Sequence, residues 1–78
     1  MIPTKRELLR SLIGKKVEMF GETDNRTILK YDSQRRRGYI VINEVGGEMI
    51  EYTPYGVDGA PGKNIYLSMD GITMIEKM

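Results

Sequence analysis

The chain has 78 residues, a net charge of +1 and neither cysteine nor histidine. This length predicts a single domain, residues 1–78, and the composition excludes disulfides, thiolate zinc sites and the commonest side chain for acid–base catalysis. The charge is unevenly spread, since residues 1–38 carry ten Lys or Arg against five Asp or Glu, whereas residues 39–78 carry two against six.

The N-terminal segment has the pattern of a short amphipathic helix, expected over about residues 4–13. Residues 4–7, Thr-Lys-Arg-Glu, have the sequence of a capping box, in which the threonine and glutamate side chains each satisfy a backbone amide. Apolar residues at helical spacing then form one stripe: Leu8, Leu9, Leu12 and Ile13. Gly14 follows where a left-handed C-terminal cap is needed, so the helix is expected to end there.

After Gly14 the hydrophobic period shortens to two residues, which is typical of β-strands. The segments expected as strands are 16–20, 27–32, 39–42, 48–52, 65–69 and 72–75. Residues 39–42, Tyr-Ile-Val-Ile, are apolar on both faces and are predicted to lie centrally in the sheet. Asp70-Gly71 separates the last two segments and is typical of a tight turn between paired strands.

Residues 53–64 contain two prolines and three glycines and are expected to form a long loop, either functional or a mobile insertion. Together the elements predict a mainly β fold, in which a short N-terminal helix precedes a five-stranded, bent antiparallel small barrel. No segment resembles an export signal or an apolar run of the roughly 20 residues that cross a bilayer, and cysteine is absent. We therefore expect a cytoplasmic protein without a membrane partner.

The sequence gives no support for catalysis, a cofactor or a metal site. Nucleophilic catalysis needs a nucleophile with a base beside it, and no serine lies in an elbow motif. Glu44, Glu48 and Glu51 gather near the fourth strand, where we interpret them as a solvent-exposed strand face. Asp58-Gly59 in the long loop supplies too few oxygen ligands for a hard cation and is interpreted as a turn.

The sharpest polar feature is the run Arg35-Arg36-Arg37 in the turn between the second and third strands. Lys30 and Tyr31 precede this run, and Tyr39 follows it. Cationic side chains neutralise phosphates, so the run and Lys30 form a candidate nucleic-acid site. Alternatively, the run is a solubilising turn or pairs with the acidic second half of the chain, and both tyrosines pack in the core or across strands.

Four segments follow the order of parts of a known family. Residues 9–20 contain Gly-Lys-Lys-Val and resemble a passage from helix to first strand, and residues 27–32 resemble a second strand that ends in aspartate. Residues 39–44 are similar to a third strand, and residues 65–75 to a second motif of two strands around a turn with glycine. This order resembles the Sm-like (Lsm) family, whose fold is an N-terminal helix followed by a strongly bent five-stranded antiparallel barrel.

The resemblance implies RNA as a ligand and Asp32 and Gly71 as positions of the nucleotide site. It also implies homo-oligomers, such as rings, in which the fourth strand of one subunit pairs with the fifth of the next; such assembly would stabilise a core as small as this one. The sequence departs from the family pattern because Thr27 replaces a glycine, no asparagine closely follows Asp32, and Asp70 replaces an arginine. The resemblance therefore supports fold and ring assembly more strongly than recognition of uridine.

We expect a non-catalytic binding protein, an oligomeric Sm-like RNA binder without a cofactor. Its candidate nucleic-acid contacts are Arg35, Arg36, Arg37, Lys30, Asp32 and Gly71. The alternative is a structural or protein-interaction subunit with an SH3-like barrel and no nucleic-acid binding. A third hypothesis is a small binder of double-stranded DNA that uses the same arginines.

Overall fold

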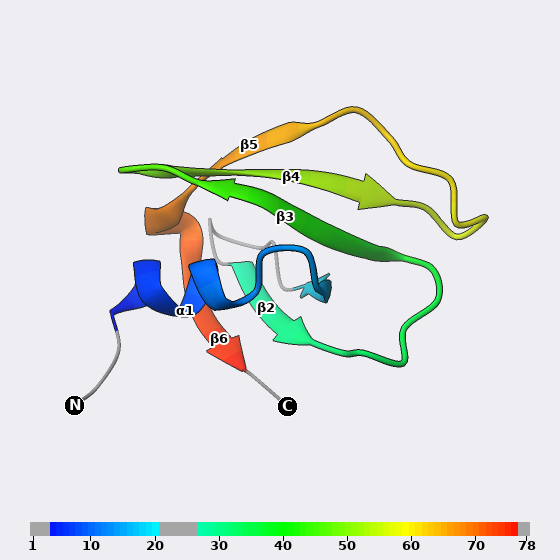
Figure 1. Cartoon of the computed structure of the whole chain (residues 1–78), viewed down its shortest axis with the longest axis horizontal. Helices are drawn as coiled ribbons and strands as arrows, with labels where there is room; N and C mark the ends of the chain where they lie inside the picture. The colour runs from blue at the N-terminus through cyan, green and yellow to red at the C-terminus, as the bar shows by residue number, and fades with distance from the viewer. Residues whose placement is uncertain (1–3, 21–26, 77–78) are drawn as a thin grey trace.

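A short helix precedes a series of β-strands in the computed structural model, which describes residues 4–20 and 27–76 (Figure 1). The elements in chain order are helix α1 (Lys5–Ser11), strands β1 (Lys16–Phe20), β2 (Thr27–Tyr31), β3 (Tyr39–Val45), β4 (Met49–Tyr55) and β5 (Ile65–Ser68), the 3-10 helix η2 (Met69–Gly71) and strand β6 (Ile72–Glu76). The mainly β fold class with a short N-terminal helix is thus confirmed.

The six strands form one sheet in the order β5-β4-β3-β1-β2-β6. The five strands from β5 to β2 pair antiparallel with their neighbours, and β6 is added at the edge, parallel to β2. Within the described residues β5 and β6 occupy the two edges and do not pair with each other. The antiparallel sheet of five strands is therefore confirmed, whereas in place of the expected barrel the sheet is open.

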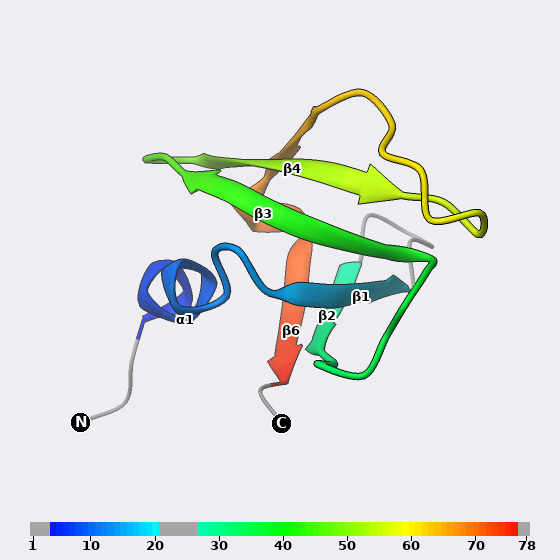
Figure 2. The same ribbon diagram turned by 45° about the vertical axis from the view of Figure 1, so that its right-hand side comes forward.

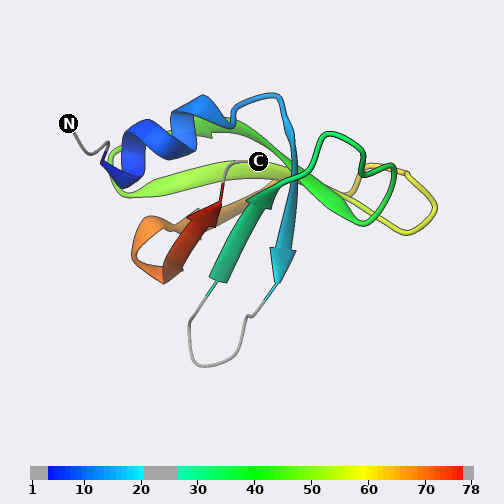
Figure 3. The same cartoon turned by 90° about the horizontal axis from the view of Figure 1, so that it is seen from below.

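The sheet bends where β1 meets β3. Only two residue pairs join these strands, Lys16 with Val41 and Val17 with Ile40, so few hydrogen bonds hold the two halves of the sheet in one plane. Figure 2 shows β3 and β4 crossing above β2 and β6. In Figure 3, α1 lies at one end of the molecule and the loops around residues 32–38 and 56–64 lie at the other.

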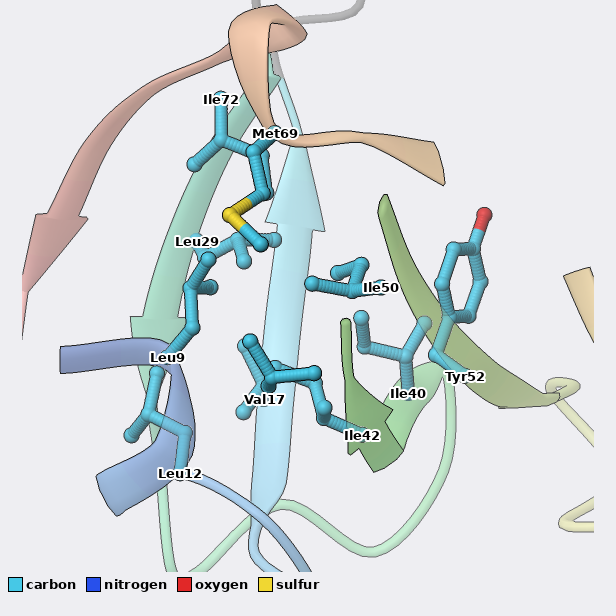
Figure 4. Close-up of a cluster of buried hydrophobic side chains, with 11 residues drawn as sticks. Leu9, Leu12, Val17, Leu29, Ile40, Ile42, Ile50, Tyr52, Met69 and Ile72 are labelled. Carbon is cyan, nitrogen blue, oxygen red and sulfur yellow. The ribbon is translucent and has the colours of Figure 1, made fainter. Parts of the chain in front are cut away.

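The core fills the space inside the bend, and α1 and its C-cap each contribute one side chain (Figure 4). The fully buried apolar side chains come from the helix and from strands of both halves of the sheet: Leu9, Leu12, Val17, Leu29, Ile42, Ile50 and Ile72. In the predicted helical stripe, Leu9 and Leu12 are fully buried, whereas Ile13 is 41% exposed. The helix ends at Ser11 with Leu12 as its C-cap, which is earlier than predicted. Ile13 therefore lies beyond the helix, and its side chain is not held on the buried helical face.

The ends of α1 follow their sequence signals in part. The Thr4 hydroxyl accepts a hydrogen bond from the Glu7 amide at 3.2 Å, which confirms the threonine half of the capping box. The Glu7 carboxylate accepts from the Thr4 hydroxyl at 3.3 Å. Gly14 has the expected left-handed backbone, with a φ of 79°, and its amide donates to the Ile42 carbonyl at 3.0 Å. Gly14 therefore directs the chain from the helix into the sheet, two residues after the C-cap.

Strand β4 extends three residues into the predicted loop 53–64, as far as Tyr55. Pro54 is tolerated in this stretch because β5 pairs with β4 only up to Tyr52. The Pro54 nitrogen, which carries no hydrogen, therefore faces no partner strand. The Pro54 carbonyl on that side accepts a hydrogen bond from the Gly62 amide at 2.8 Å. Residues 56–64 then connect β4 to β5.

The Asp70-Gly71 pair does not form the expected tight turn between paired strands. Both residues belong to η2, where the Ser68 hydroxyl accepts from the Asp70 amide at 3.3 Å. Because η2 carries the chain from β5 at one edge of the sheet to β6 at the other, no hairpin forms there. The hairpin prediction is therefore wrong, although the chain does turn at these residues.

Candidate nucleic-acid interface

The turn between β2 and β3, residues 32–38, is here called the arginine turn. It is organised by Asp32, whose Oδ1 accepts from the Gln34 amide at 2.9 Å and whose carbonyl accepts from the Arg35 amide at 3.2 Å. The Gly38 amide donates to the Gly56 carbonyl at 3.0 Å and so fixes the end of the turn to the loop after β4. Asp32 thus shapes the turn, and its carboxylate is committed to the backbone.

The three arginines of this turn have different surroundings. Arg35 forms an ion pair with Glu18 of β1, and its Nε donates to the Arg37 carbonyl at 3.0 Å. Arg37 reaches the Val57 carbonyl at 3.5 Å. Arg36 is exposed and, among the residues that the structure describes, makes no side-chain hydrogen bond or ion pair. Arg36 therefore presents its whole charge to solvent, whereas the charge of Arg35 is partly neutralised.

The arginine side chains line a shallow depression of about 460 Å³. Asp32, Gln34 and Gly38 form its floor and sides together with Val57, whose side chain is 76% exposed at the tip of the neighbouring loop. A depression bordered by three guanidinium groups favours an anionic ligand, since each group can donate hydrogen bonds in a planar fork to phosphate.

Two tyrosines lie directly beside the arginine turn. Tyr39 at the start of β3 is opposite Tyr55 at the end of β4, and their rings stack with centroids 4.9 Å apart and planes inclined by 19°. The Lys16 ammonium lies over the Tyr39 ring, 5.5 Å from its centroid. The predicted cross-strand packing of Tyr39 is confirmed, and both tyrosines are half-buried outside the core. This end of the sheet therefore combines aromatic faces with cations.

A second lysine–tyrosine contact joins the residue before β1 to the last residue of β2. The Lys15 ammonium is 5.1 Å from the centroid of the Tyr31 ring, and Tyr31 is half-buried against the edge of the core. Cations over aromatic rings are held in place by the ring quadrupole, so both lysines are positioned at this end of the sheet. Sequence reasoning missed Lys15, Lys16 and Tyr55 as candidate contacts; the Lys15-Lys16 dipeptide was the only local signal for any of them.

The predicted contact residues do not all come together. Arg35, Arg36, Arg37 and Asp32 share the arginine turn, and Lys30 on β2 is paired in register with Glu18, the partner of Arg35. Gly71 lies elsewhere, because β6 runs parallel to β2 and the pair begins with Thr27 opposite Ile72.

Five residues of extended chain separate Thr27 from Asp32, so Gly71 lies about 16 Å from Asp32 along the strand direction. Gly71 therefore does not lie beside the arginines, and its role as a nucleic-acid contact stays a prediction. The physical reason is the parallel entry of β6, which places its first residue at the far end of β2.

The other end of the β3–β4 pair is acidic. Glu44, Glu48, Met49, Glu51 and Tyr66 line a groove of about 310 Å³, here called the acidic groove. The interpretation of the three glutamates as a surface face is confirmed, since Glu44 and Glu48 are exposed and Glu51 is half-buried. The described residues include no group of three or more carboxylates placed to hold a metal ion.

One tyrosine in the acidic groove has a perturbed ionisation. The Tyr66 hydroxyl donates to Glu51 Oε2 at 3.0 Å. This hydrogen bond and the negative charge of Glu51 raise the pKa of Tyr66, and the charge of Glu44 adds to the effect. The groove thus combines three carboxylates with an exposed aromatic ring.

Comparison of the chain with models of protein families, with curated proteins and with solved structures gives no match. Over residues 4–20 and 27–76, the helices are too short and too polar to cross a bilayer. Function must therefore be argued from the surface that the fold builds.

Proposed function

We propose that the protein is a non-catalytic binder of single-stranded nucleic acid, and of RNA in particular. The observation that carries this proposal is the position of the Tyr39–Tyr55 stack between Lys16 and the arginine turn. Proteins that bind single strands combine a cationic path for phosphates with aromatic faces on which bases stack.

The charges support a phosphate path across this end of the molecule. Arg36 has a free guanidinium group within the described part of the chain, and Arg37 borders the same depression. Lys16 begins β1 and Lys15 directly precedes it, and each ammonium lies over a tyrosine ring. A single strand that passes from the arginine turn to the lysines would cross the tyrosine pair. Lys30 remains a proposed contact. It lies on β2, with Glu18 of β1 on one side and the edge strand β6 on the other.

Single strands fit this surface better than a duplex. A protein that reads a duplex generally places a helix or a two-stranded ribbon in a groove, and α1 lies at the opposite end of the molecule from the arginine turn (Figure 3). Stacking on tyrosine requires bases that are not already stacked in a helix. Duplex DNA should therefore bind more weakly than a single strand of the same charge.

Fluorescence anisotropy with labelled 12-nucleotide RNA and DNA single strands, and with the DNA duplex, tests this proposal at two salt concentrations. A phosphate binder should lose affinity with salt, with a slope of log K against log salt of about −0.7 for each phosphate contact. The triple variant Arg35→Gln, Arg36→Gln, Arg37→Gln should lose most binding, whereas the control Arg10→Gln, an exposed arginine on α1, should keep it. Equal affinity of the triple variant and the wild type would refute the proposal.

A second copy of the chain is the other proposed partner. The two edges of the open sheet, β5 and β6, support this proposal because edge strands carry backbone groups available for pairing. Sedimentation velocity measures the oligomeric state directly, and a monomer at all concentrations would refute it. The cytoplasmic location stays a prediction.

A further inference from the structure

The acidic groove is the surface that the proposed RNA site leaves without a role. Two of the large exposed apolar side chains line it from adjacent strands: Met49 of β4 is 46% exposed and Tyr66 of β5 is 63% exposed. Together with the glutamates they form an apolar strip bordered by negative charge at an open edge of the sheet. A strip of this kind favours a ligand that is both cationic and flat.

A guanidinium group has this chemistry. It stacks on an aromatic face and at the same time donates paired hydrogen bonds to carboxylates. The exposed ring of Tyr66 is held by Glu51, and among the described residues no lysine or arginine forms an ion pair with Glu44, Glu48 or Glu51. The groove therefore offers carboxylates and a ring to an arginine from outside this molecule.

The arginine turn of a second copy supplies such groups. Within one molecule the two surfaces cannot meet, because the arginine turn precedes β3 and the acidic groove lies at its end, about 20 Å away along a seven-residue strand. The molecule is elongated, with a longest extent of 38 Å, so the two charged ends face in opposite directions. Complementary ends of this kind meet between neighbouring copies.

We propose that copies of this chain associate head to tail, with the arginine turn of one copy in the acidic groove of the next. Arg36 enters beside Tyr66, and its guanidinium group pairs with Glu44 and Glu51. The contact is heterologous, so it forms open chains or, with a suitable rotation between copies, a ring. It also covers Met49 and Tyr66, which are exposed in the single chain.

This contact bears on the proposed function because both use the same arginines. The acidic groove of a neighbour and the phosphates of RNA compete for Arg36, so RNA should separate the assembled copies. This competition rests on the proposed function, whereas the head-to-tail contact does not. Since the charged groups lie at the surface, the association should weaken at high salt.

Sedimentation velocity at low and high salt, over a range of protein concentrations, tests the contact. The wild type should associate at low salt, and Arg36→Glu or Glu51→Lys alone should weaken association by about tenfold. An equimolar mixture of these two variants should associate again, because the reversed turn of one fits the reversed groove of the other. Controls are Glu7→Lys and Arg10→Glu on α1, which reverse exposed charges that line neither the acidic groove nor the arginine turn.

The stacking part of the contact has its own pair of variants. Tyr66→Phe keeps the ring and should associate like the wild type, whereas Tyr66→Ala should associate more weakly. Circular dichroism of each variant checks that the sheet is intact. A wild type that stays monomeric at low salt overturns the proposal, and so does a mixture of Arg36→Glu and Glu51→Lys that stays dissociated.

The RNA measurement separates the two hypotheses. Glu51→Lys should bind RNA with at least the affinity of the wild type, since its arginine turn is intact and free of a neighbour. If Glu51→Lys binds RNA but associates like the wild type, the head-to-tail contact is wrong and the RNA site stands. If copies associate head to tail and RNA does not bind at all, the RNA site is wrong and the head-to-tail contact stands.

Discussion

Tyr39 and Tyr55 stack across two antiparallel strands, with ring centroids 4.9 Å apart and ring planes inclined by 19°. Tyr39 is the first residue of β3 and Tyr55 is the last residue of β4, so the pair lies directly beside two loops. The hydrogen bond from the Gly38 amide to the Gly56 carbonyl joins these loops. The rings are therefore held in a fixed orientation before any ligand binds, which lowers the entropy cost of stacking a base on them.

Removing one ring of this pair should weaken RNA binding without changing its dependence on salt. For Tyr55→Ala we expect a loss of about 1–3 kcal/mol in RNA affinity, the usual worth of one stacked base. Tyr55→Phe keeps the aromatic face and should bind as the wild type does. The measurement is anisotropy over a salt series, in which the slope of log K should be the same for all three proteins. A salt slope for Tyr55→Ala that is shallower than the slope of the wild type would instead assign Tyr55 an electrostatic role.

The ion pair between Glu18 and Arg35 should restrain RNA binding. Its side chains are 21% and 43% exposed respectively, so the pair contributes little to stability but does occupy one of three guanidinium groups. For Glu18→Gln we expect RNA affinity to rise about two- to fivefold, and the salt slope to become steeper, because Arg35 becomes available to phosphate. The control is Glu7→Gln, which removes a carboxylate from α1. Unchanged affinity of Glu18→Gln would show that Arg35 does not contact the ligand.

The fold class was predictable because it depends on local patterns. The change of hydrophobic period at Gly14 separated the helix from the strands, and the β-branched run of β3 identified a central strand. The end of β4 was not predictable in the same way, because Pro54 is usually excluded from strands and is accepted here only where β5 no longer pairs.

The candidate site was predicted only as far as it is contiguous in sequence. The arginine run was found because its residues follow one another, whereas Tyr55 and Lys16 join them through strand register, which is set by tertiary packing. Gly71 was placed in the site because its position matches the Sm-like nucleotide site, and a separate dipeptide signal predicted a hairpin at Asp70-Gly71. The direction of β6 depends on where its apolar residues find the core, and a dipeptide signal carries no information about this.

The ionisation of Tyr66 should depend on one neighbouring carboxylate above all. Its pKa lies above the ordinary value of 10.0, mainly because its hydroxyl donates to Glu51. The neutral hydroxyl is thus favoured in the folded state, and the stability that this adds is fully present below pH 10.0 and is lost as the pH rises through the raised pKa of the folded state.

For Glu51→Gln we expect the pKa of Tyr66 to fall toward 10.0, whereas Glu44→Gln should lower it less, because Glu44 acts through its charge alone. The measurement is the pH dependence of the Tyr66 ring carbon signal in NMR. Equal effects of the two substitutions would mean that the hydrogen bond to Glu51 does not exist in solution.

The link between helix and sheet should depend on the backbone of Gly14. Its φ of 79° lies in the left-handed region, and a Cβ added there would meet no atom within 4 Å, so the cost of Gly14→Ala is purely conformational. We expect this substitution to destabilise the protein by about 1–2 kcal/mol, measured by urea denaturation. Gly47→Ala is a matched control, since a Cβ there also meets no atom within 4 Å and the backbone is not left-handed. The control should be neutral or slightly stabilising, because alanine reduces the freedom of the unfolded chain. Equal stability of both variants would show that Gly14 does not hold a left-handed backbone, and the transition from α1 to β1 would need another explanation.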